Sequence, residues 1–482
     1  MKKINLGNAI TKVHFIGIGG ISMSGLAEVL KRDGYTVTGS DNSQTAITDH
    51  LQSVGIPVAF PNAAANIPPD ADMIVYTAAI RPDNPEFIAA RETGKPMLER
   101  AALLGLMLQG YDKAICVAGS HGKTTATMFM TEILLEAGLD PTISIGGHLG
   151  RTGSNYRVGE SDYFLLESCE YSNSFLHWHP HVGIILNIDA DHLDFFGTFE
   201  NVVASFKKFA ENIRPGGVLV VQEEAVSVIA SKTKQSRGTE LGLLQAFGPR
   251  NDVNIITFGE TSGRFIPGSI VYDNMGRPSF DVLDNNIPLA RINLPIPGSY
   301  NMLNALAAFA AAYGLGVAPD TIARALSNAK GVKRRYEYKG TCNGIQIIDD
   351  YAHHPTAILE CLAASRRAAQ GRLVCIFQPH TYTRTRNHFD DFARAFTDAD
   401  KILLLPIYAA REPFDPSISS LQLADAIREN GKDVLHLNDF DEAINFLQAE
   451  LIPGDLLITM GAGDVHFVGE ALLETRLSTV ST

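Results

Sequence analysis

Short β-rich runs alternate with amphipathic helical segments along almost the whole chain, and this alternation restricts the fold more than any other feature. The first set of runs is "KVHFIGIGG", "TVTGSD" and "DMIVYTAAI", the second begins at "KAICVAGS", and the third starts with "GIQIIDD". Strands that alternate with helices build mostly parallel sheets covered by helices. The length of 482 residues suits about three domains of ~150 residues each. We therefore predict an α/β protein with domains at residues 1–110, 111–330 and 331–482.

One segment interrupts the alternation. The stretch "RFIPGSIVYDNMGRPSFDVLDNNIPLARINLPIPG" has the pattern of meandering antiparallel strands joined by polar turns. The apolar segment "NMLNALAAFAAAYGLG" follows it and has the character of a buried helix. We expect both to belong to the second domain.

Composition excludes several classes of partner. The net charge of −13 argues against a large surface for nucleic acid or an anionic membrane. No apolar run approaches the length of a membrane span, and the N-terminal residues lack the apolar core of a signal peptide. The five cysteines are scattered and form no Cys-x-x-Cys pair, which is typical of reduced thiols in the cytosol. We expect a cytoplasmic protein with no nucleic-acid partner and no membrane attachment.

A glycine-rich turn follows the first strand and opens a helix; it consists of Gly17, Ile18, Gly19 and Gly20. In this setting backbone N–H groups can reach a diphosphate at a helix N-terminus. Asp41 ends the second strand, where an acidic side chain can bind a ribose hydroxyl. Ser22 replaces the third glycine of the dinucleotide pattern Gly-x-Gly-x-x-Gly. The residues leave three interpretations open: a dinucleotide site, another diphosphate site, or a structural turn.

The stretch "AGSHGKTT" is the stronger phosphate motif; its polar part is Gly119, Ser120, His121, Gly122, Lys123, Thr124 and Thr125. It follows the apolar run "KAICVA" and precedes a helical segment with an apolar face. Loop amides and Lys123 would hold the β- and γ-phosphates of ATP, and a threonine hydroxyl would bind Mg²⁺. The spacer between its glycines has two residues, whereas the common nucleotide loop has four.

Candidate magnesium ligands follow two later strands. Glu167 and Glu170 lie in "LLESCEYSNSF", and Asp189, Asp191 and His192 lie in "LNIDADHLD". The C-terminal ends of parallel strands are where α/β sheets place their sites. A hard cation prefers oxygen ligands, so His192 would be an unusual ligand, and the alternative is a hydrogen-bonding loop residue.

Two further polar patterns have competing interpretations. In "HWHPHVG" three histidines alternate, but Pro180 interrupts the run and no cysteine or carboxylate completes a zinc set, so we favour a surface turn. In the third region, "DDYAHHP", "QPHTYTRTR" and "GAGD" place His380 beside Arg384 and Arg386. Arginine forks bind carboxylates and phosphates, so these clusters predict a pocket for a small zwitterion and a polyphosphate. The alternative is a solvated charged face.

Taken together, these stretches resemble the Mur ligase family, the ATP-dependent amide ligases of peptidoglycan precursor synthesis. The resemblance runs over nearly the whole chain and is carried by "HFIGIGGISMSGLAE", "DNPE", "AGSHGKTT", "ESCEYSNSFL", "NIDADHLD", "PGSYNMLNALAA", "GVKRRYE", "IIDDYAHHP", "FQPHTYTRTR" and "TMGAGD". It implies a Rossmann-like N-terminal domain for a UDP-sugar, a central ATPase domain and a Rossmann-like C-terminal domain. Within the family the chain is most similar to members that join L-alanine to UDP-N-acetylmuramate.

The resemblance also implies roles for individual residues. Lys123 would bind the ATP phosphates, and the metal set would be Thr124, Glu167 and His192. Further nucleotide contacts would come from Asn301, Asn304, Arg335 and Asp350. The incoming amino acid would meet His353, His380 and Arg384, with His353 removing or positioning a proton. The first glycine turn and Asp41 would bind the UDP-sugar.

Three positions depart from the family's pattern or extend it. Tyr300 stands where the family has a histidine, which affects stacking on adenine. Thr381 stands where the family has an arginine, which affects the binding and choice of amino acid. Lys207 lies at the offset of a lysine that is carbamylated in several related ligases; the alternative is an ordinary helix-surface lysine.

The implied activity is phosphorylation of a carboxylate by ATP, with Mg²⁺, followed by attack of an amine on the acyl phosphate. A close alternative is the family's recycling ligase, which adds a preformed tripeptide to UDP-N-acetylmuramate. A nicotinamide-dependent dehydrogenase and a non-catalytic sugar-nucleotide binder are the alternatives from other classes. We expect a monomer or a homodimer.

Overall fold

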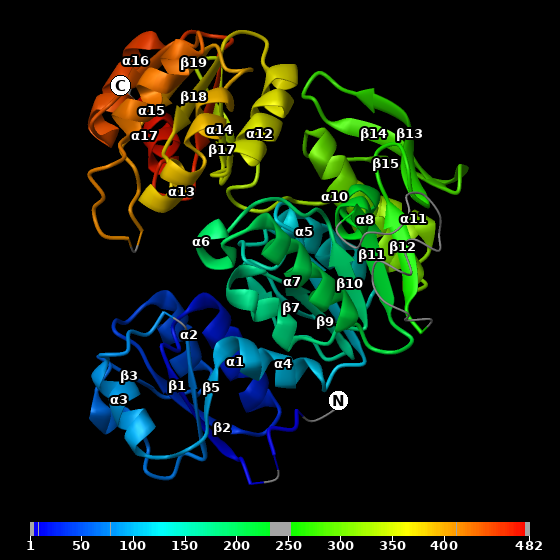
Figure 1. Cartoon of the computed structure of the whole chain (residues 1–482), viewed down its shortest axis with the longest axis vertical. Coiled ribbons are helices and arrows are strands. Elements are labelled where there is room, and N and C mark those ends of the chain that lie inside the picture. Colours follow the sequence, from blue (N-terminus) through cyan, green and yellow to red (C-terminus); the bar gives the residue numbers. More distant parts are fainter. Residues whose placement is uncertain (1–3, 8, 78, 232–251, 411, 478–482) are drawn as a thin grey trace. The chain divides into compact units, whose positions relative to one another are not determined.

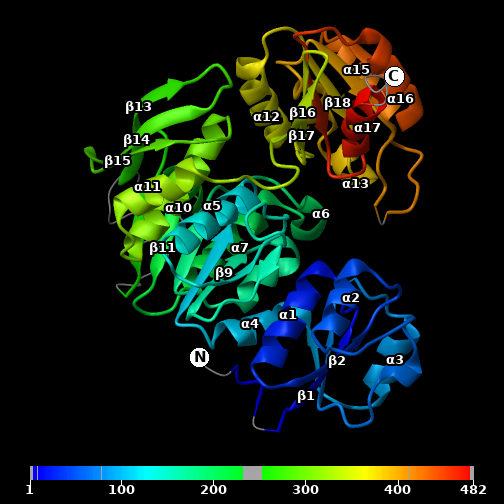
Figure 2. The same cartoon turned by 180° about the vertical axis from the view of Figure 1, so that it is seen from behind.

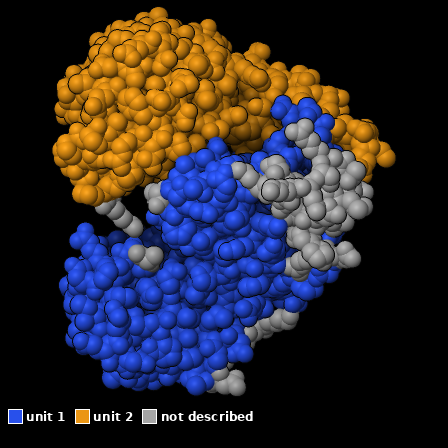
Figure 3. Space-filling view, viewed as in Figure 1, with its two compact units in different colours: residues 1–265, 307–325 blue, residues 266–306, 326–482 orange. Residues whose placement is uncertain are grey.

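The computed structural model describes residues 4–7, 9–77, 79–231, 252–410 and 412–477. The chain divides into two compact units (Figure 3): residues 1–265 with 307–325, and residues 266–306 with 326–482. These units are delimited differently from the three predicted domains, whose borders stay predictions. Among the helices of the described ranges, none is long and apolar enough to cross a membrane.

The first unit begins with a five-stranded parallel sheet in the order β3-β2-β1-β4-β5 (blue in Figure 1). Its strands are β1 (Lys12–Ile16), β2 (Thr36–Ser40), β3 (Val58–Ala59), β4 (Met73–Tyr76) and β5 (Met97–Glu99). Its helices are α1 (Ile21–Arg32), α2 (Ala46–Ser53), η1 (Ala64–Asn66), α3 (Pro85–Glu92) and α4 (Arg100–Leu108). This confirms the predicted strand, glycine turn, helix and strand at the start of the chain.

Local sequence explains where these helices begin. Thr45 and Thr48 form a reciprocal capping box at α2. The Asn84 side chain accepts hydrogen bonds from two amides of α3, and Pro85 occupies the first helical position, where its missing N–H costs nothing. α3 therefore starts at a defined residue, which places the side chain of Glu86 in its first turn.

The rest of the first unit carries seven strands of a second, mainly parallel sheet that has ten strands in all in the described part of the chain; these seven follow the order β12-β11-β10-β6-β9-β7-β8. The strands are β6 (Lys113–Ala118), β7 (Thr142–Ser144), β8 (Tyr156–Arg157), β9 (Tyr163–Glu167), β10 (Val182–Ile185), β11 (Val218–Gln222) and β12 (Asn254–Phe258). The helices are α5 (Lys123–Glu136), η2 (Tyr171–His177), α6 (Leu193–Phe196), α7 (Phe199–Glu211) and α8 (Glu223–Ser231). Only β8 runs antiparallel to its neighbour β7 among these strands.

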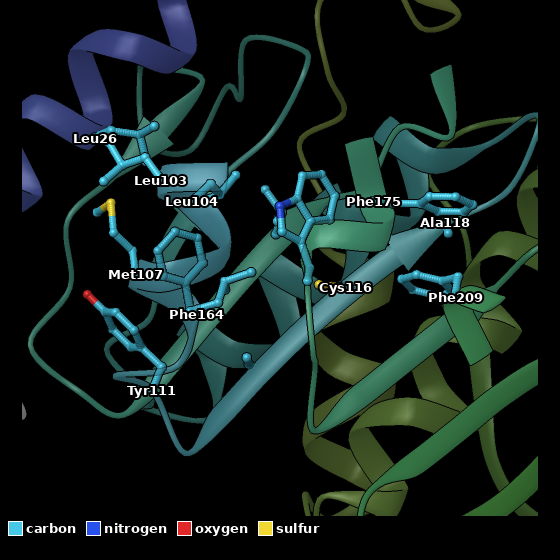
Figure 4. Packing of buried hydrophobic residues seen from close by; sticks show 14 of the residues in the cluster. Leu26, Leu103, Leu104, Met107, Tyr111, Cys116, Ala118, Phe164, Phe175 and Phe209 are labelled. Carbon is cyan, nitrogen blue, oxygen red and sulfur yellow. The ribbon is translucent and has the colours of Figure 1, made fainter. Parts of the chain in front are cut away.

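The apolar strands of this sheet are buried on both faces. Cys116 and Phe164 belong to the face that packs against α4, η2 and α7, and Figure 4 shows this cluster with Phe175 beside Phe209. Those two rings stack with centroids 4.9 Å apart. Helix α5, labelled in Figure 2, is buried over most of its length. A near-continuous apolar run in a strand is what burial on both faces requires.

The second unit contains the predicted meander and a third sheet. The meander consists of β13 (Phe265–Tyr272), β14 (Pro278–Asp284) and β15 (Ile287–Asn293), and β14 pairs with β15 in antiparallel register. The helices α10 (Ser299–Gly314) and α11 (Pro319–Ser327) follow. The chain passes between the two units within β13, α10 and α11.

The third sheet has the order β16-β17-β21-β18-β19-β20 (yellow to red in Figures 1 and 2). Its strands are β16 (Glu337–Cys342), β17 (Ile345–Asp350), β18 (Leu373–Phe377), β19 (Lys401–Leu404), β20 (Val434–His436) and β21 (Leu456–Met460). Its helices are α12 (Pro355–Ala368), α13 (Tyr382–Asn387), α14 (Phe389–Arg394), α15 (Ser420–Glu429), α16 (Phe440–Glu450) and α17 (His466–Leu477). β16 is antiparallel to β17, and the other described pairs are parallel.

Alternate residues of the third sheet enter two separate cores. Phe377 and Ile458 pack with residues of α12, α14 and α15. Ile376 and Leu457 pack with residues of α16 and α17. Successive side chains of a strand point to opposite faces. The sheet is therefore covered by helices on both sides.

Candidate active site

Three neighbouring strands of the second sheet end at the same edge, and a polar loop follows each of them. β9, β6 and β10 are adjacent and parallel. β6 leads into the glycine loop, β9 ends at Glu167, and Asn187 comes two residues after β10. The carboxyl ends of parallel strands are where α/β sheets bind their ligands. The structure thus brings the predicted nucleotide loop together with both predicted carboxylate loops.

The loop between β6 and α5 requires glycine at both ends. Gly119 has a φ of +150° and Gly122 a φ of +81°, which L side chains rarely adopt. A Cβ on Gly119 would also lie 2.9 Å from Cβ of Leu186. Helix α5 starts at Lys123, so the first amides of the helix lack carbonyl partners within it. The two-residue spacer therefore forms a compact turn onto a helix N-terminus, which suits an anion.

The loop's backbone is held by the segment that follows β10. The His121 amide donates to Oδ1 of Asn187 at 2.8 Å, and Nδ2 of Asn187 donates to the His121 carbonyl at 3.1 Å. The Asp189 amide donates to Oγ of Ser120 at 2.9 Å, and Asp189 Oδ2 lies 2.9 Å from His121 Nε2. These bonds fix the loop's shape before any ligand binds.

Lys123 is held among oxygen atoms at the loop. Its Nζ donates to the Gly119 carbonyl at 2.6 Å, to the Ser120 carbonyl at 3.1 Å and to Oε2 of Glu170 at 2.9 Å. Burial is the largest single influence on the Lys123 ammonium and would lower its pKa, but the charge and hydrogen bond of Glu170, with the charges of Cys169 and Glu167, together outweigh burial and raise that pKa above its ordinary value. Lys123 is therefore a permanent cation at the place predicted for the phosphates.

Thr124 and Glu167 form an oxygen pair beside this lysine. Oγ1 of Thr124 donates to Oε1 of Glu167 at 2.8 Å, and the Gly146 amide donates to Oε2 of Glu167 at 2.6 Å. Thr125 is buried in the first turn of α5. Hydroxyl and carboxylate oxygens are the ligands that a hard cation prefers.

His192 lies with a different pair of carboxylates. Its Nε2 is 4.0 Å from Oε1 of Glu170 and 3.8 Å from Oδ2 of Asp191. These three residues offer ligand atoms within 4.8 Å of one another. Its φ of +56° is unusual for a residue other than glycine and fixes the turn into α6. The predicted metal set of Thr124, Glu167 and His192 stays a prediction, and Glu170 and Asp191 are additional candidates.

The N-terminal glycine turn is closed by its own domain. The amides of Gly17 and Ile18 donate to the Ser40 carbonyl, both at 2.9 Å. The Gly19 amide donates to Oδ2 of Asp41 at 2.8 Å, and the Gly20 amide donates to the Gly17 carbonyl at 3.2 Å. Each of these four amides already has an acceptor in this structure, and binding of the UDP-sugar at the turn stays a prediction. The turn instead sets where helix α1 begins.

In the second unit, the predicted nucleotide residues lie at the start of α10 and around β17. Asn301 and Asn304 are buried, and Nδ2 of Asn301 donates to the Pro297 carbonyl at 2.7 Å. Asp350 accepts hydrogen bonds from the amides of Tyr336 and Ala352, both at 2.7 Å. Burial raises the pKa of the Asp350 carboxyl, which the charge of Arg335 partly offsets.

The side chain of Tyr351 lies between two arginines and a histidine. Arg334 and Arg335 place their guanidinium carbons 5.0 and 4.9 Å from its ring centroid. The ring of His353 lies edge-on to it at 5.3 Å, and Nδ1 of His353 is 2.8 Å from the Tyr351 carbonyl. Arg335, which is predicted to bind the nucleotide, and His353, which is predicted to bind the amino acid, thus both pack against the ring of Tyr351.

His353, His380 and Arg384 come together as predicted for an amino-acid pocket. The rings of His353 and His380 are 5.7 Å apart, and Nη1 of Arg384 is 3.2 Å from Nδ1 of His380. The ring of His380 stacks on Tyr408 at 5.7 Å. Burial, and then the charge of Arg384, lower the pKa of His380 to about 4. At neutral pH the pair is a neutral imidazole beside a guanidinium.

The two departures from the family's pattern have local explanations. Thr381 has a φ of +65° and its hydroxyl accepts a hydrogen bond from the Arg384 amide, so it caps α13. The ring of Tyr300 packs on the core of the third sheet. A Cβ on Gly298, whose φ is +103°, would lie 2.5 Å from that ring. Each side chain therefore has a role in local packing or capping.

Other sequence predictions have mixed outcomes. Trp178 is buried and donates from Nε1 to the Ala101 carbonyl at 3.2 Å, so "HWHPHVG" is not wholly a surface turn. His181 lies 3.2 Å from Nζ of Lys113, and no described metal cluster includes it. Lys207 is half-buried on α7, and its carbamylation stays a prediction. The hydrogen bonds between Asn187 and the loop were not predicted, although an asparagine two residues after an apolar strand can be recognised in the sequence.

Comparison with known proteins identifies the family. The model described as "Mur ligase family, catalytic domain" matches residues 12–112. The model described as "Mur ligase middle domain" matches residues 117–312, and the model described as "Mur ligase, glutamate ligase domain" matches residues 334–463. The chain belongs to the Mur ligase family.

Individual Mur ligases are similar over their whole length. The UDP-N-acetylmuramate–L-alanine ligase of Lachnospira eligens is 46% identical over 98% of this chain and 100% of that protein. The crystal structure of UDP-N-acetylmuramate-alanine ligase from Thermotoga maritima has a TM-score of 0.76 and 27% identity, covering 97% and 99% of the two chains. A murein peptide ligase from Psychrobacter arcticus has a TM-score of 0.66 and 26% identity, covering 97% and 98%. The chain is a Mur ligase with the family's three-part α/β architecture.

Proposed function

We propose that this ligase joins L-alanine to the carboxylate of UDP-N-acetylmuramate, with conversion of ATP to ADP and phosphate. The observation that carries the proposal is the 46% identity to a relative of that name over 98% of the chain. The loop, its lysine and the Thr124–Glu167 pair supply the chemistry that such a reaction needs.

The reaction needs an activated carboxylate, because an amine does not displace an oxide group from a carboxylate in water. An oxygen of the muramyl carboxylate forms a bond to the γ-phosphorus of ATP, the bond to the bridging oxygen breaks, and ADP leaves. Lys123 and the amides at the start of α5 bind the phosphates and offset the charge that develops there. The amine of L-alanine then attacks the acyl carbon, loses a proton, and phosphate leaves from the tetrahedral intermediate.

The residues present fit Mg²⁺. Thr124 and Glu167 are hard oxygen donors in direct contact, and we assign them with His192 as the residues that would hold the ion. When bound, Mg²⁺ supplies further neutralisation of phosphate charge. The carboxylate of Glu170 orients Lys123 until a phosphate of ATP takes the place of that carboxylate beside the ammonium group.

The groups in the second unit suit a zwitterion. Arg384 offers a guanidinium fork for the carboxylate of the amino acid. His380 is neutral at pH 7 because of its lowered pKa, and its Nδ1 accepts from Arg384, so its Nε2–H is left to donate a hydrogen bond to the carboxylate of the amino acid. We assign proton removal or positioning at the amine to His353.

The test is release of phosphate by the purified protein with ATP, Mg²⁺, UDP-N-acetylmuramate and L-alanine. We expect release to require all four, and Lys123→Ala to abolish it while UDP-sugar binding survives. Lys208→Ala, on the exposed side of α7, is the matched control and should keep full activity. No release by the wild-type protein would reject the proposal.

The same assay ranks the alternative amines. Replacing L-alanine by L-alanyl-γ-D-glutamyl-diaminopimelate tests the recycling activity, for which the murein peptide ligase of Psychrobacter arcticus is a structural relative. Glycine and L-serine test how strictly the pocket with Thr381 selects its amino acid. We expect L-alanine to be preferred over all three.

We further propose a cytoplasmic monomer or homodimer, which acts without nucleic acid or membrane. Its product would enter cell-wall biogenesis, and through it cell shape, the cell cycle and division. Size measurement by light scattering distinguishes the two oligomeric states.

A further inference from the structure

A buried carboxylate joins four segments of the first sheet's domain. Glu86, in the first turn of α3, is fully buried. Its Oε1 lies 2.9 Å from Nε2 of His14 on β1 and accepts from Oγ of Ser40 at 2.7 Å. Its Oε2 accepts from Nδ2 of Asn62 at 3.0 Å, from the Ala63 amide at 3.1 Å and from Nδ2 of Asn66 at 3.2 Å.

A buried carboxylate destabilises the folded state unless both of its oxygens accept hydrogen bonds. A buried carboxylate loses its hydration, which disfavours the charged form. Burial by itself would raise the pKa of Glu86, but hydrogen bonds from His14, Ser40 and the two asparagines outweigh burial and lower that pKa. Glu86 is therefore ionised at neutral pH with both oxygens fully used. Apolar side chains would fill this space at lower cost, so the carboxylate has a task beyond filling it.

The network continues into the glycine turn through one residue. Ser40, whose hydroxyl donates to Glu86, also accepts the amides of Gly17 and Ile18 on its carbonyl. Nδ2 of Asn62 donates to the same hydroxyl at 2.9 Å, so Ser40 is held from two sides. The next residue, Asp41, receives the Gly19 amide on its side chain. The backbone of the turn is thus hydrogen-bonded to Ser40 and Asp41, and the hydroxyl of Ser40 is in turn hydrogen-bonded to Glu86.

We infer that Glu86 is a positioning residue for the UDP-sugar site, acting through Ser40 on the glycine turn and the start of α1. Glu86 is fully buried, so its carboxylate is not available to contact the nucleotide directly. The inference rests on the proposed function, together with the prediction from the family resemblance that the turn and Asp41 bind the UDP-sugar. According to this inference, α3 contributes to the affinity for the UDP-sugar although it lies outside the turn. It does not contribute to the affinity for ATP or for the amino acid.

The test is Glu86→Gln, which keeps the volume but replaces one acceptor oxygen by an amide that faces donors. We expect KM for UDP-N-acetylmuramate to rise tenfold or more, with kcat and KM for ATP within twofold of the wild type. Glu92→Gln, on an exposed position of the same helix, is the matched control and should change nothing. Equal changes in all three constants would mean general loss of structure and would overturn the inference, as would an unchanged KM.

Ser40→Ala keeps the inference testable if Glu86→Gln does not fold. It removes the hydroxyl through which Ser40 contacts Glu86, while the Ser40 carbonyl keeps its hydrogen bonds from the amides of Gly17 and Ile18. We expect the same selective rise in KM, about threefold, and an unchanged KM overturns the inference. A wild-type protein without UDP-N-acetylmuramate-dependent turnover would instead reject the proposed function, so the two failures are distinguishable.

Discussion

Asn187 holds the nucleotide loop by its backbone, through a pair of hydrogen bonds to the amide and carbonyl of His121. A side-chain amide can make this pair because it carries a donor and an acceptor side by side. A loop shaped in advance loses less conformational entropy when phosphate binds. Asn187 should therefore contribute to ATP affinity without contacting ATP.

We predict that Asn187→Ala raises KM for ATP by about tenfold, which corresponds to about 1.4 kcal/mol. The reason is that the His121 amide and carbonyl lose both partners and the loop becomes free to adopt other shapes. Steady-state kinetics with saturating UDP-sugar and amino acid measure it. Asn438→Ala, at an exposed position outside the site, is the control. An unchanged KM for ATP would show that the loop keeps its shape without Asn187.

His380 makes folding depend on pH. Its folded pKa of about 4 lies below the unfolded value of about 6.5. Between these values the unfolded chain binds a proton that the folded chain does not, so this residue's contribution to stability falls as pH is lowered from about 6.5 towards 4. We predict that His380→Asn loses less stability over this window than the wild type does. Urea unfolding at pH 7.5 and pH 5 measures it, and parallel losses in both proteins would contradict it.

Single residues of the site differ in how far sequence reveals them. Lys123 and Thr124 follow from the strand, glycine loop and helix pattern, because a phosphate loop demands those residue types in that order. The links from Asn187 to His121 and from Glu86 to Ser40 span 66 and 46 residues. Such pairs depend on how strands are ordered in a sheet, which residue spacing does not specify.

At the scale of elements, β2 and the glycine turn pack so closely that only glycine fits between them. A Cβ on Gly39 would lie 2.6 Å from Cδ1 of Ile18 and 2.8 Å from the Phe15 carbonyl oxygen. Backbone oxygen cannot move aside without disturbing β1. The close approach of β2 to the turn thus depends on glycine at position 39.

We predict that Gly39→Ala destabilises the protein by about 1–3 kcal/mol, the usual cost of overpacking. Gly20→Ala is the control, because the nearest atom to its Cβ would be the Gly17 carbonyl oxygen at 3.4 Å, an ordinary contact. Urea unfolding of both variants gives the comparison. Equal stabilities would show that β2 and the turn separate easily.

The longer apolar elements were predictable from the sequence, whereas several short or edge strands were not. Runs such as Lys113–Ala118 are apolar and flanked by glycine or polar turns, so their strand character shows in the sequence. The short strands β3, β5, β7 and β8 were not predicted, nor was the strand β16, Glu337–Cys342. Its residues are half-buried or exposed, because it lies at the edge of the third sheet and pairs only with β17. An edge strand carries little of the apolar pattern on which prediction relies.

At the scale of the whole molecule, the third sheet has a complete core of its own on each face. Helices cover both sides, so a chain containing only this sheet would leave little of its core exposed. Independent folding is expected of a region with its own core.

We predict that residues 331–482 expressed alone fold and unfold cooperatively in urea. Phe377, fully buried in this sheet, provides the control: Phe377→Ala should lower the stability of the fragment by about 3 kcal/mol. A broad transition without cooperativity would show that residues 266–306, which cluster with this sheet, are required. The result would also test the predicted domain border.

The contact between Lys123 and Glu170 has a consequence for selectivity inside a cell. A bare ammonium at a helix N-terminus would attract chloride, sulfate and free phosphate, all of which compete with nucleotide. Here the lysine is already neutralised by a carboxylate at 2.9 Å. An incoming anion must outcompete that carboxylate, which a polyphosphate with several charges does more easily than a small ion. Under the proposed function, we therefore expect Glu170 to disfavour small anions at the loop relative to a nucleotide polyphosphate.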